Sequence, residues 1–494
     1  MRLLAALATF LFTLTAFAQI AVDPRAVDTL MRNTMKAWGI PGAAIAIVQN
    51  DRVVYVQGYG VKALGGTEPV TPDTLFQIAS TSKAFTSTAL AMLATDKKLT
   101  FDDPVRKHVE YFRLSDLCAD ANVTLRDLVS HRTGVSRHDE LWDDTPLTRE
   151  DVVRSMAHIA PSRPFRTTYQ YQNIMFIAAG EAVAHASGMS WDDFVRTRIF
   201  KPLGMTRTVT SDAEWNASTD RAAGHRYDWK NSRILPQGAI DTTTIGAGGA
   251  IKSSARDMGH WIRFQLGGGT FAGTRLVDAE LLAETKTPHT VIRMAGLGAQ
   301  SNPETNVMTY GMGWNIQDYR GEQLVAHAGA LNGFRTHVAL LPKRNAGFVL
   351  LINAARGIGL YALRNSLADM LTGKPAKDWN PYYLMIDRAA DEKSEKEKEE
   401  RLAKRIPNTT PTRALADYAG QYEHPGYGTL QVTRDGEQLA LEWQRVKAPM
   451  VHLQYDTFYA EDGGHDVEET VTFVLDEERR VVALNVFGER FVKR

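Results

Sequence analysis

The chain has 494 residues, of which 44% are apolar and 23% charged, the profile of a folded protein large enough for two or three domains. Lysine plus arginine equals aspartate plus glutamate at 57 each, so charge gives no argument for nucleic acid or an acidic membrane as a partner. The single cysteine, Cys118, excludes an intrachain disulfide, and we expect it to be structural.

The first eighteen residues are typical of a secretory signal peptide. Arg2 supplies a short positive start, residues 3–14 are apolar, and Ala-Phe-Ala at 16–18 fits the small-x-small cleavage pattern. We therefore expect cleavage after Ala18 and a secreted or periplasmic protein; the alternative is an uncleaved anchor. This run is short for a membrane-spanning helix, and we expect no integral membrane segment after cleavage.

Helical and strand-like patterns follow one another up to residue 385. Residues 27–38 have helical periodicity, and residues 40–61 are typical of two strands joined at Asn50-Asp51. A strong helix is expected to begin at Ser80, and strand-like runs return at 336–342 and 346–355. Strands at both ends with helices between them predict one α+β domain whose sheet is assembled from distant segments.

The composition changes at residue 386. Residues 386–411 are highly charged with alternating signs and end in a proline-containing stretch, which predicts a solvated helix or linker. In residues 412–494, alternating apolar residues flank turns such as Asp435-Gly436, which predicts a small antiparallel barrel or sandwich.

Residues 76–85 read FQIASTSKAF and place Ser80 three residues before Lys83. On a helix these side chains share a face, so a lysine of lowered pKa could take the proton that a serine nucleophile must lose. A Ser-x-x-Lys pair occurs by chance in roughly every chain of this size, so Lys83 taken alone would be interpreted as a surface charge.

Two later stretches supply candidate partners. RTTYQYQNIMF contains Tyr171 and Asn173 before an apolar helix, and VAHAGALNGF contains His327 and Gly329 before an apolar strand. Taken singly, Tyr171 would be a core aromatic, Asn173 a helix N-cap and His327 a structural residue. We expect His131, which precedes a Thr-Gly turn, to be structural and to support the site.

Taken in order, these motifs resemble those of the penicillin-recognising serine hydrolases: Ser80-x-x-Lys83, Tyr171-x-Asn173 and His327-x-Gly329. The most similar branch holds class C β-lactamases, D-aminopeptidases and β-lactamase-like esterases. Phrases such as VTLRDLVSHRTG, GAGGAIKSSARDM and YGMGW extend the resemblance over residues 27–355. It implies an α+β domain over 19–385, with an antiparallel sheet flanked by helices plus an all-helical region. The β segment 412–494 resembles, more loosely, the lipocalin-like domain of some members.

The resemblance assigns roles to these residues. Ser80 would attack a carbonyl, Lys83 and Tyr171 would share the proton transfers, and Asn173 would orient the substrate and hydrogen-bond Lys83. A positive Lys83 would lower the pKa of Tyr171, which would then activate the deacylating water.

The third motif completes the site that the resemblance implies. His327 would hold a polar group of the substrate and the Tyr171 hydroxyl. The backbone N–H groups of Ser80 and Ala330 would form the oxyanion hole, and Gly329 would let its strand approach the substrate closely.

The second and third motifs depart from the family's common set of S-x-x-K, S-D-N and K-T-G. Tyr171 replaces a serine, as in the class C branch, and His327 replaces a lysine, as in many peptidases and esterases. An imidazole is a weaker carboxylate anchor, with a charge that varies near pH 6.5. We therefore expect hydrolysis of a small peptide, especially one with D-residues, or of a small ester. The alternatives are a class C-like β-lactamase and a non-catalytic acyl-binding sensor or scaffold.

We expect no metal and no organic cofactor. His138, Asp139 and Glu140 match no zinc-ligand spacing well, and glycine-rich residues 246–249 lack the context of a nucleotide-binding loop. The expected partner is a small molecule or short peptide. The C-terminal domain is expected to mediate homo-oligomers, bind another partner or cap the active site.

Overall fold

The computed structural model describes residues 21–228, 231, 233–462 and 467–494. The expected signal peptide, residues 1–18, lies outside the described residues. Among those that are described, no helix combines the length and apolarity needed to cross a membrane.

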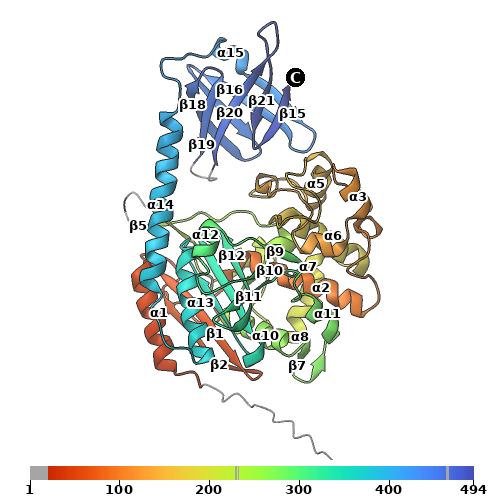
Figure 1. The fold of residues 1–494 in the computed structure, drawn as a ribbon, viewed down its shortest axis with the longest axis vertical. Coiled ribbons are helices and arrows are strands. Elements are labelled where there is room, and N and C mark those ends of the chain that lie inside the picture. Colours follow the sequence, from red (N-terminus) through yellow and green to blue (C-terminus); the bar gives the residue numbers. More distant parts are fainter. Residues whose placement is uncertain (1–20, 229–230, 232, 463–466) are drawn as a thin grey trace, which may run out of the picture.

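An eight-stranded antiparallel sheet organises the main body, in the order β2-β1-β14-β13-β12-β11-β10-β9 (Figure 1). Its strands, in chain order, are β1 (Gly42–Gln49), β2 (Arg52–Gly60), β9 (Thr290–Ile292), β10 (Met308–Tyr310), β11 (Asn315–Tyr319), β12 (Glu322–Leu331), β13 (Phe334–Leu341) and β14 (Ala346–Ile352). The first strand pairs with the last, so Ala43 lies opposite Ile352. The expected hairpin is confirmed: Asn50 and Asp51 both have left-handed backbones, as a tight two-residue turn requires.

Helices cover both faces of this sheet. Helices α1 (Pro24–Trp38) and α13 (Gly357–Thr372) share one apolar cluster with alternate residues of β1, and α10 (Ala255–Leu266) packs on the other face. Every residue of β1 is therefore buried, which explains its nearly unbroken apolar sequence.

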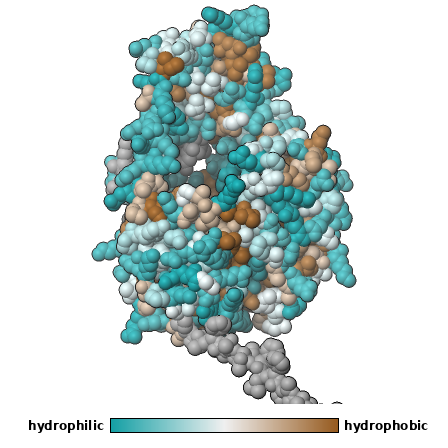
Figure 2. Space-filling model, in the orientation of Figure 1, coloured by the Kyte–Doolittle hydropathy of each residue, from teal (hydrophilic) through white to brown (hydrophobic). Residues whose placement is uncertain are grey.

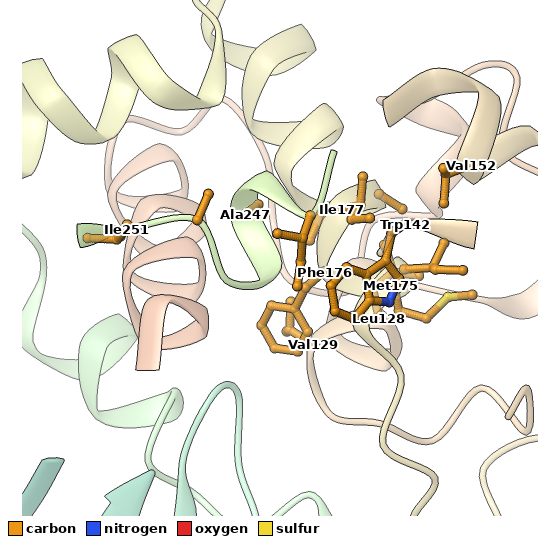
Figure 3. Packing of buried hydrophobic residues seen from close by; sticks show 14 of the residues in the cluster. Leu128, Val129, Trp142, Val152, Met175, Phe176, Ile177, Ala247 and Ile251 are labelled. Atoms are coloured by element: carbon orange, nitrogen blue, oxygen red, sulfur yellow. The ribbon is translucent and has the colours of Figure 1, made fainter. Parts of the chain in front are cut away.

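A mostly helical region lies beside the sheet (Figure 1). Its helices are α2 (Lys83–Thr95), α3 (Leu117–Asn122), α4 (Leu125–Val129), α5 (Arg149–Ser155), α6 (Asn173–Ser187), α7 (Trp191–Val195), α8 (Lys201–Leu203), α9 (Asp212–Ala217) and α11 (Ala279–Glu284). Figure 3 shows how Trp142 packs with Leu128 and Met175 in the apolar centre of this region. The remaining short elements are α12 (Gly296–Gln300) and three two-stranded sheets, formed by β3 (Phe76–Gln77) with β6 (Lys252–Ser253), β4 (His225–Asp228) with β5 (Arg233–Pro236), and β7 (Thr270–Phe271) with β8 (Thr274–Arg275).

The C-terminal segment forms a closed antiparallel barrel of eight strands. They are β15 (Gly420–His424), β16 (Gly428–Asp435), β17 (Gln438–Trp443), β18 (Val446–Gln454), β19 (Thr457–Asp462), β20 (Val467–Leu475), β21 (Val481–Val486) and β22 (Glu489–Lys493), preceded by the short helix α15 (Leu415–Tyr418). Helix α14 (Asn380–Ala403) connects the main body to the barrel, and Figure 2 shows a largely hydrophilic surface over it. The expected α+β fold with a C-terminal β-barrel is confirmed.

Helix α2 differs from the expected helix in its start and its surroundings. Residues Ala79–Ser82 form a single 3₁₀ turn, and the α-helix begins at Lys83 rather than at Ser80. Residues 83–93 are all buried, because other helices pack around α2 on every side. Phe85 stacks on Trp261 of α10, with ring centroids 3.7 Å apart.

We expect Trp261→Ala to lower the free energy of unfolding by about 3–5 kcal/mol, because it leaves a cavity between α10 and α2. Urea denaturation measures this loss. Leu117→Ala is the control, since Leu117 is 83% exposed and should change stability by less than about 0.5 kcal/mol. Equal effects of the two substitutions would contradict the packing described.

Candidate active site

Ser80 lies in the 3₁₀ turn that leads into α2, partly accessible to solvent. Ala79, directly before it, is buried and has a φ of 48°, a left-handed conformation that non-glycine residues rarely adopt. Such strain persists when the surrounding structure holds it, and it is concentrated at functional sites. The turn presents the Ser80 hydroxyl above the first turn of α2.

Lys83 is completely buried, and its side-chain nitrogen has three oxygen atoms within hydrogen-bonding distance. Nζ lies 2.7 Å from Asn173 Oδ1, 2.7 Å from the backbone oxygen of Gly248 and 3.1 Å from Ser80 Oγ. Burial holds the pKa of Lys83 well below its usual value; Arg137 lowers it further, whereas Asp139 acts in the opposite direction. A neutral lysine has two N–H groups and one lone pair. The two carbonyl oxygens accept the N–H groups, which leaves the lone pair for the Ser80 hydroxyl.

Tyr171 lies beside this pair and hydrogen-bonds Ser80. Burial raises the pKa of Tyr171, although the Ser80 hydrogen bond and Arg137 act in the opposite direction. The expectation of a lowered Tyr171 pKa is therefore wrong, because desolvation dominates. Tyr171 stays a phenol at neutral pH.

Asn173 is the first residue of α6, and its side chain is buried beneath the site. Its Oδ1 accepts from Lys83, while its Nδ2 donates to Asp139 Oδ1 at 2.9 Å. The capping role expected of Asn173 belongs to Gln172 instead, whose side chain accepts from the backbone N–H of Ile174. The side chain of Asn173 thus hydrogen-bonds Lys83 through its oxygen and Asp139 through its NH₂ group.

His327, on β12, is buried and has well-defined partners on both ring nitrogens. Its Nδ1 lies 2.6 Å from the Ala328 oxygen, and its Nε2 lies 2.9 Å from the Tyr310 hydroxyl. Since a carbonyl oxygen only accepts, Nδ1 carries the proton and Nε2 accepts from Tyr310. Burial lowers the pKa of His327 to about 3, so the expected change of charge near pH 6.5 is wrong. His327 therefore hydrogen-bonds the Tyr310 hydroxyl, in place of the Tyr171 hydroxyl that was expected as its partner.

The third-motif strand lies directly against the serine turn. A Cβ added to Gly329 would lie 2.4 Å from the backbone oxygen of Ile78, so only glycine fits here. Ser80, Tyr171, His327, Gly329 and Ala330 line one pocket of about 260 Å³, with Lys83 and Asn173 buried outside its lining. The geometry therefore brings together all seven residues predicted from the sequence.

Three residues beside the site were not expected to act there. Tyr310 belongs to the YGMGW segment, which contributes to the family resemblance. The sequence did not show that the Tyr310 hydroxyl hydrogen-bonds His327. Arg137 lines the pocket, 4.9 Å from the Tyr171 ring, and its Nε lies 2.5 Å from Asp139 Oδ2. The described part of the chain contains no cluster of side chains able to hold a metal ion.

His131 has the supporting position expected for it. It is buried, its ring centroid lies 4.3 Å from that of Tyr171, and its Nδ1 accepts from the backbone N–H of Gln172 at 3.1 Å. It therefore packs against the tyrosine and bonds the backbone directly after it.

The fold and the arrangement of these residues are those of the β-lactamase and transpeptidase-like family of serine hydrolases. Residues 27–369 match the family model described as Beta-lactamase, and the chain belongs to this family. Residues 404–492 match a domain of unknown function, DUF3471, which covers the barrel.

The relatives agree with this assignment. Unguisins hydrolase ungD' of Aspergillus campestris is 31% identical over 83% of this chain and 77% of its own length. Protein flp of Staphylococcus aureus is 25% identical over 66% of this chain and 62% of its own. The octameric penicillin-binding protein homologue from Pyrococcus abyssi has the same fold, with a TM-score of 0.61 and 22% identity over 96% of this chain and all of its own.

We expect the rate of Ser80 acylation to be constant at alkaline pH and to fall at lower pH, as Lys83 gains a proton. The fall should follow the lowered pKa of Lys83, below the usual lysine value near 10.4. The measurement is the rate of labelling by a fluorophosphonate between about pH 4 and pH 11.

Lys83→Arg should be unlabelled throughout this range, because a guanidinium stays protonated. A wild-type rate that rises only above about pH 10, as for an ordinary lysine, would contradict a neutral Lys83.

Proposed function

We propose that this protein cleaves an amide or ester through an acyl-enzyme on Ser80. The observation that carries the proposal is the geometry of Lys83, whose two protons are taken up by carbonyl oxygens while its lone pair is left for Ser80 Oγ at 3.1 Å. A surface lysine would have neither the burial nor these partners.

The reaction begins when Ser80 Oγ attacks the carbonyl carbon and its proton moves to Lys83 Nζ. The backbone N–H groups of Ser80 and Ala330 stabilise the oxyanion. On collapse, the bond to the leaving group breaks and the leaving group takes the proton from Lys83, relayed by the Tyr171 hydroxyl that hydrogen-bonds Ser80. Water then attacks the acyl ester while the same groups remove its proton and return one to Ser80 Oγ.

We propose small peptides, including ones with D-residues, or small esters as the substrates. His327 is neutral and its Nε2 is already occupied by Tyr310, so the third motif offers no cation to a β-lactam carboxylate. A relative is named as a hydrolase of unguisins, which supports a hydrolytic role for this chain. Placement in the class C branch rests on Tyr171 in the second motif.

Export to the periplasm or beyond is part of the same proposal. It rests on the charged start, apolar run and cleavage pattern of residues 1–18. The relationship of the barrel to lipocalin-like domains rests on its closed ring of eight antiparallel strands.

Ser80→Ala should abolish labelling by a fluorophosphonate or penicillin-type probe and lower kcat by at least about a thousandfold. Ser87→Ala is the matched control, because Ser87 is a buried serine on the same helix that lies away from the pocket lining. Unchanged turnover in Ser80→Ala would refute the mechanism.

A panel of D- and L-aminoacyl amides, short-chain esters and a chromogenic cephalosporin should show peptidase or esterase turnover well above cephalosporin turnover. Efficient cephalosporin hydrolysis without the other activities would instead favour a β-lactamase. Stable acylation without release would favour an acyl-binding sensor.

A further inference from the structure

The barrel contacts the main body at the loop formed by residues 137–144. The hydroxyl of Tyr427, in the turn between β15 and β16, lies 2.8 Å from His138 Nδ1 and also hydrogen-bonds Glu140. Arg445, in the turn between β17 and β18, lies 2.6 Å from Asp144. Figure 2 shows a hollow between the barrel and the main body, and these contacts lie where the two parts meet.

A second contact fixes the same edge of the barrel. Gly426 lies so close to the end of α5 that an added Cβ would be 3.1 Å from the Ser155 oxygen and 3.2 Å from Ile159 Cδ1. The apolar side chains of the barrel and those of the helical region form one continuous cluster. The barrel is therefore packed on the helical region and is more than a domain tethered by α14.

The other side of this loop reaches the active site. Asp139 Oδ1 accepts from Asn173 Nδ2 at 2.9 Å and from Trp142 Nε1 at 2.7 Å, while Oδ2 pairs with Arg137. Trp142 is buried in the apolar centre of the helical region (Figure 3). One carboxylate thus connects the loop to the amide that holds Lys83.

The residue that the barrel contacts is the one directly before Asp139. His138 has a φ of 45°, in the left-handed region that non-glycine residues rarely adopt. Both of its ring nitrogens are held, Nε2 by Ser136 Oγ at 3.0 Å and Nδ1 by the Tyr427 hydroxyl. A backbone conformation of this kind persists only where neighbours maintain it, and one of these neighbours belongs to the barrel.

We propose that Asp139 is a positioning residue that fixes the amide orientation of Asn173, and that the barrel holds Asp139 in place through the Tyr427 hydroxyl. This inference rests on the proposed function, since it concerns the base of that reaction. It makes the C-terminal domain a determinant of the acylation rate.

The side-chain amide of Asn173 has two orientations, which differ in the end that faces Lys83. The oxygen and the nitrogen of an asparagine side chain are nearly identical in shape, so packing alone does not choose between them. A carboxylate paired with Arg137 only accepts, so Asp139 selects the NH₂ group and turns Oδ1 toward Lys83. The reverse orientation would place two oxygens together and would present N–H groups to Lys83, which would then turn its lone pair away from Ser80.

The test measures the rate of Ser80 labelling by a fluorophosphonate in the full-length protein. Asp139→Ala should lower this rate by at least about tenfold, and Asp139→Asn, which keeps an oxygen for Asn173, should recover part of the loss. With an ester substrate the loss should fall on kcat while KM changes by less than about twofold.

Tyr427→Phe should lower the rate about three- to tenfold, because it removes the hydroxyl but keeps the ring packed against Trp443 and Phe487. Tyr422→Phe is the matched control: its buried hydroxyl bonds the Tyr418 oxygen inside the barrel, and the rate should stay within about twofold of wild type. In the Asp139→Ala background, Tyr427→Phe should cause no further loss.

Each outcome decides a different point. A wild-type protein that no probe labels would overturn both the proposed function and this inference. Labelled wild type with Asp139→Ala at the wild-type rate would overturn the inference alone. Additive losses from Tyr427→Phe and Asp139→Ala would show that the barrel does not act through Asp139. If Asp139→Ala does not fold, equal rates of Asp139→Asn, Tyr427→Phe, Tyr422→Phe and wild type would overturn the inference.

Discussion

Lys83 begins a helix that is buried on every side, and its desolvation is the constraint on which the rest of the site depends. Burial of this kind penalises the charged form, so the pKa of Lys83 lies well below its usual value. A neutral amine needs acceptors for its two protons, and Asn173 and Gly248 provide them. The same burial that stabilises the helical region therefore favours the neutral amine that the proposed mechanism needs.

The surroundings of this lysine are built from segments far apart in the chain. The serine turn lies against β12, where Gly329 admits the Ile78 oxygen, and Gly313, with a φ of 75°, allows close approach to the backbone of Lys83. These contacts leave no room for a side chain at either glycine. Close backbone contact therefore helps to hold the serine turn, the start of α2 and the third motif in register.

The buried histidine distinguishes this site from one built around a third-motif lysine. His327 is neutral and bonded by Tyr310, so the pocket wall at β12 offers polar groups without a fixed positive charge. Positive charge comes instead from Arg335 on β13 and from Arg137, on the loop that also carries Asp139 and contacts the barrel. The electrostatics of the pocket thus depend on two segments that lie outside the three motifs.

The sequence by itself predicted the α+β fold and the β tail, because hydrophobic periodicity is a local property. The three ordered motifs and the family that they resemble predicted the seven site residues that the structure brings together. The sequence did not determine the protonation states of Lys83, Tyr171 and His327, since these follow from burial by elements distant in sequence. Nor did it show that Asp139 bonds Asn173 or that the barrel contacts the loop before it. Those contacts join segments up to about three hundred residues apart, and only tertiary packing decides which side chains meet across such a separation.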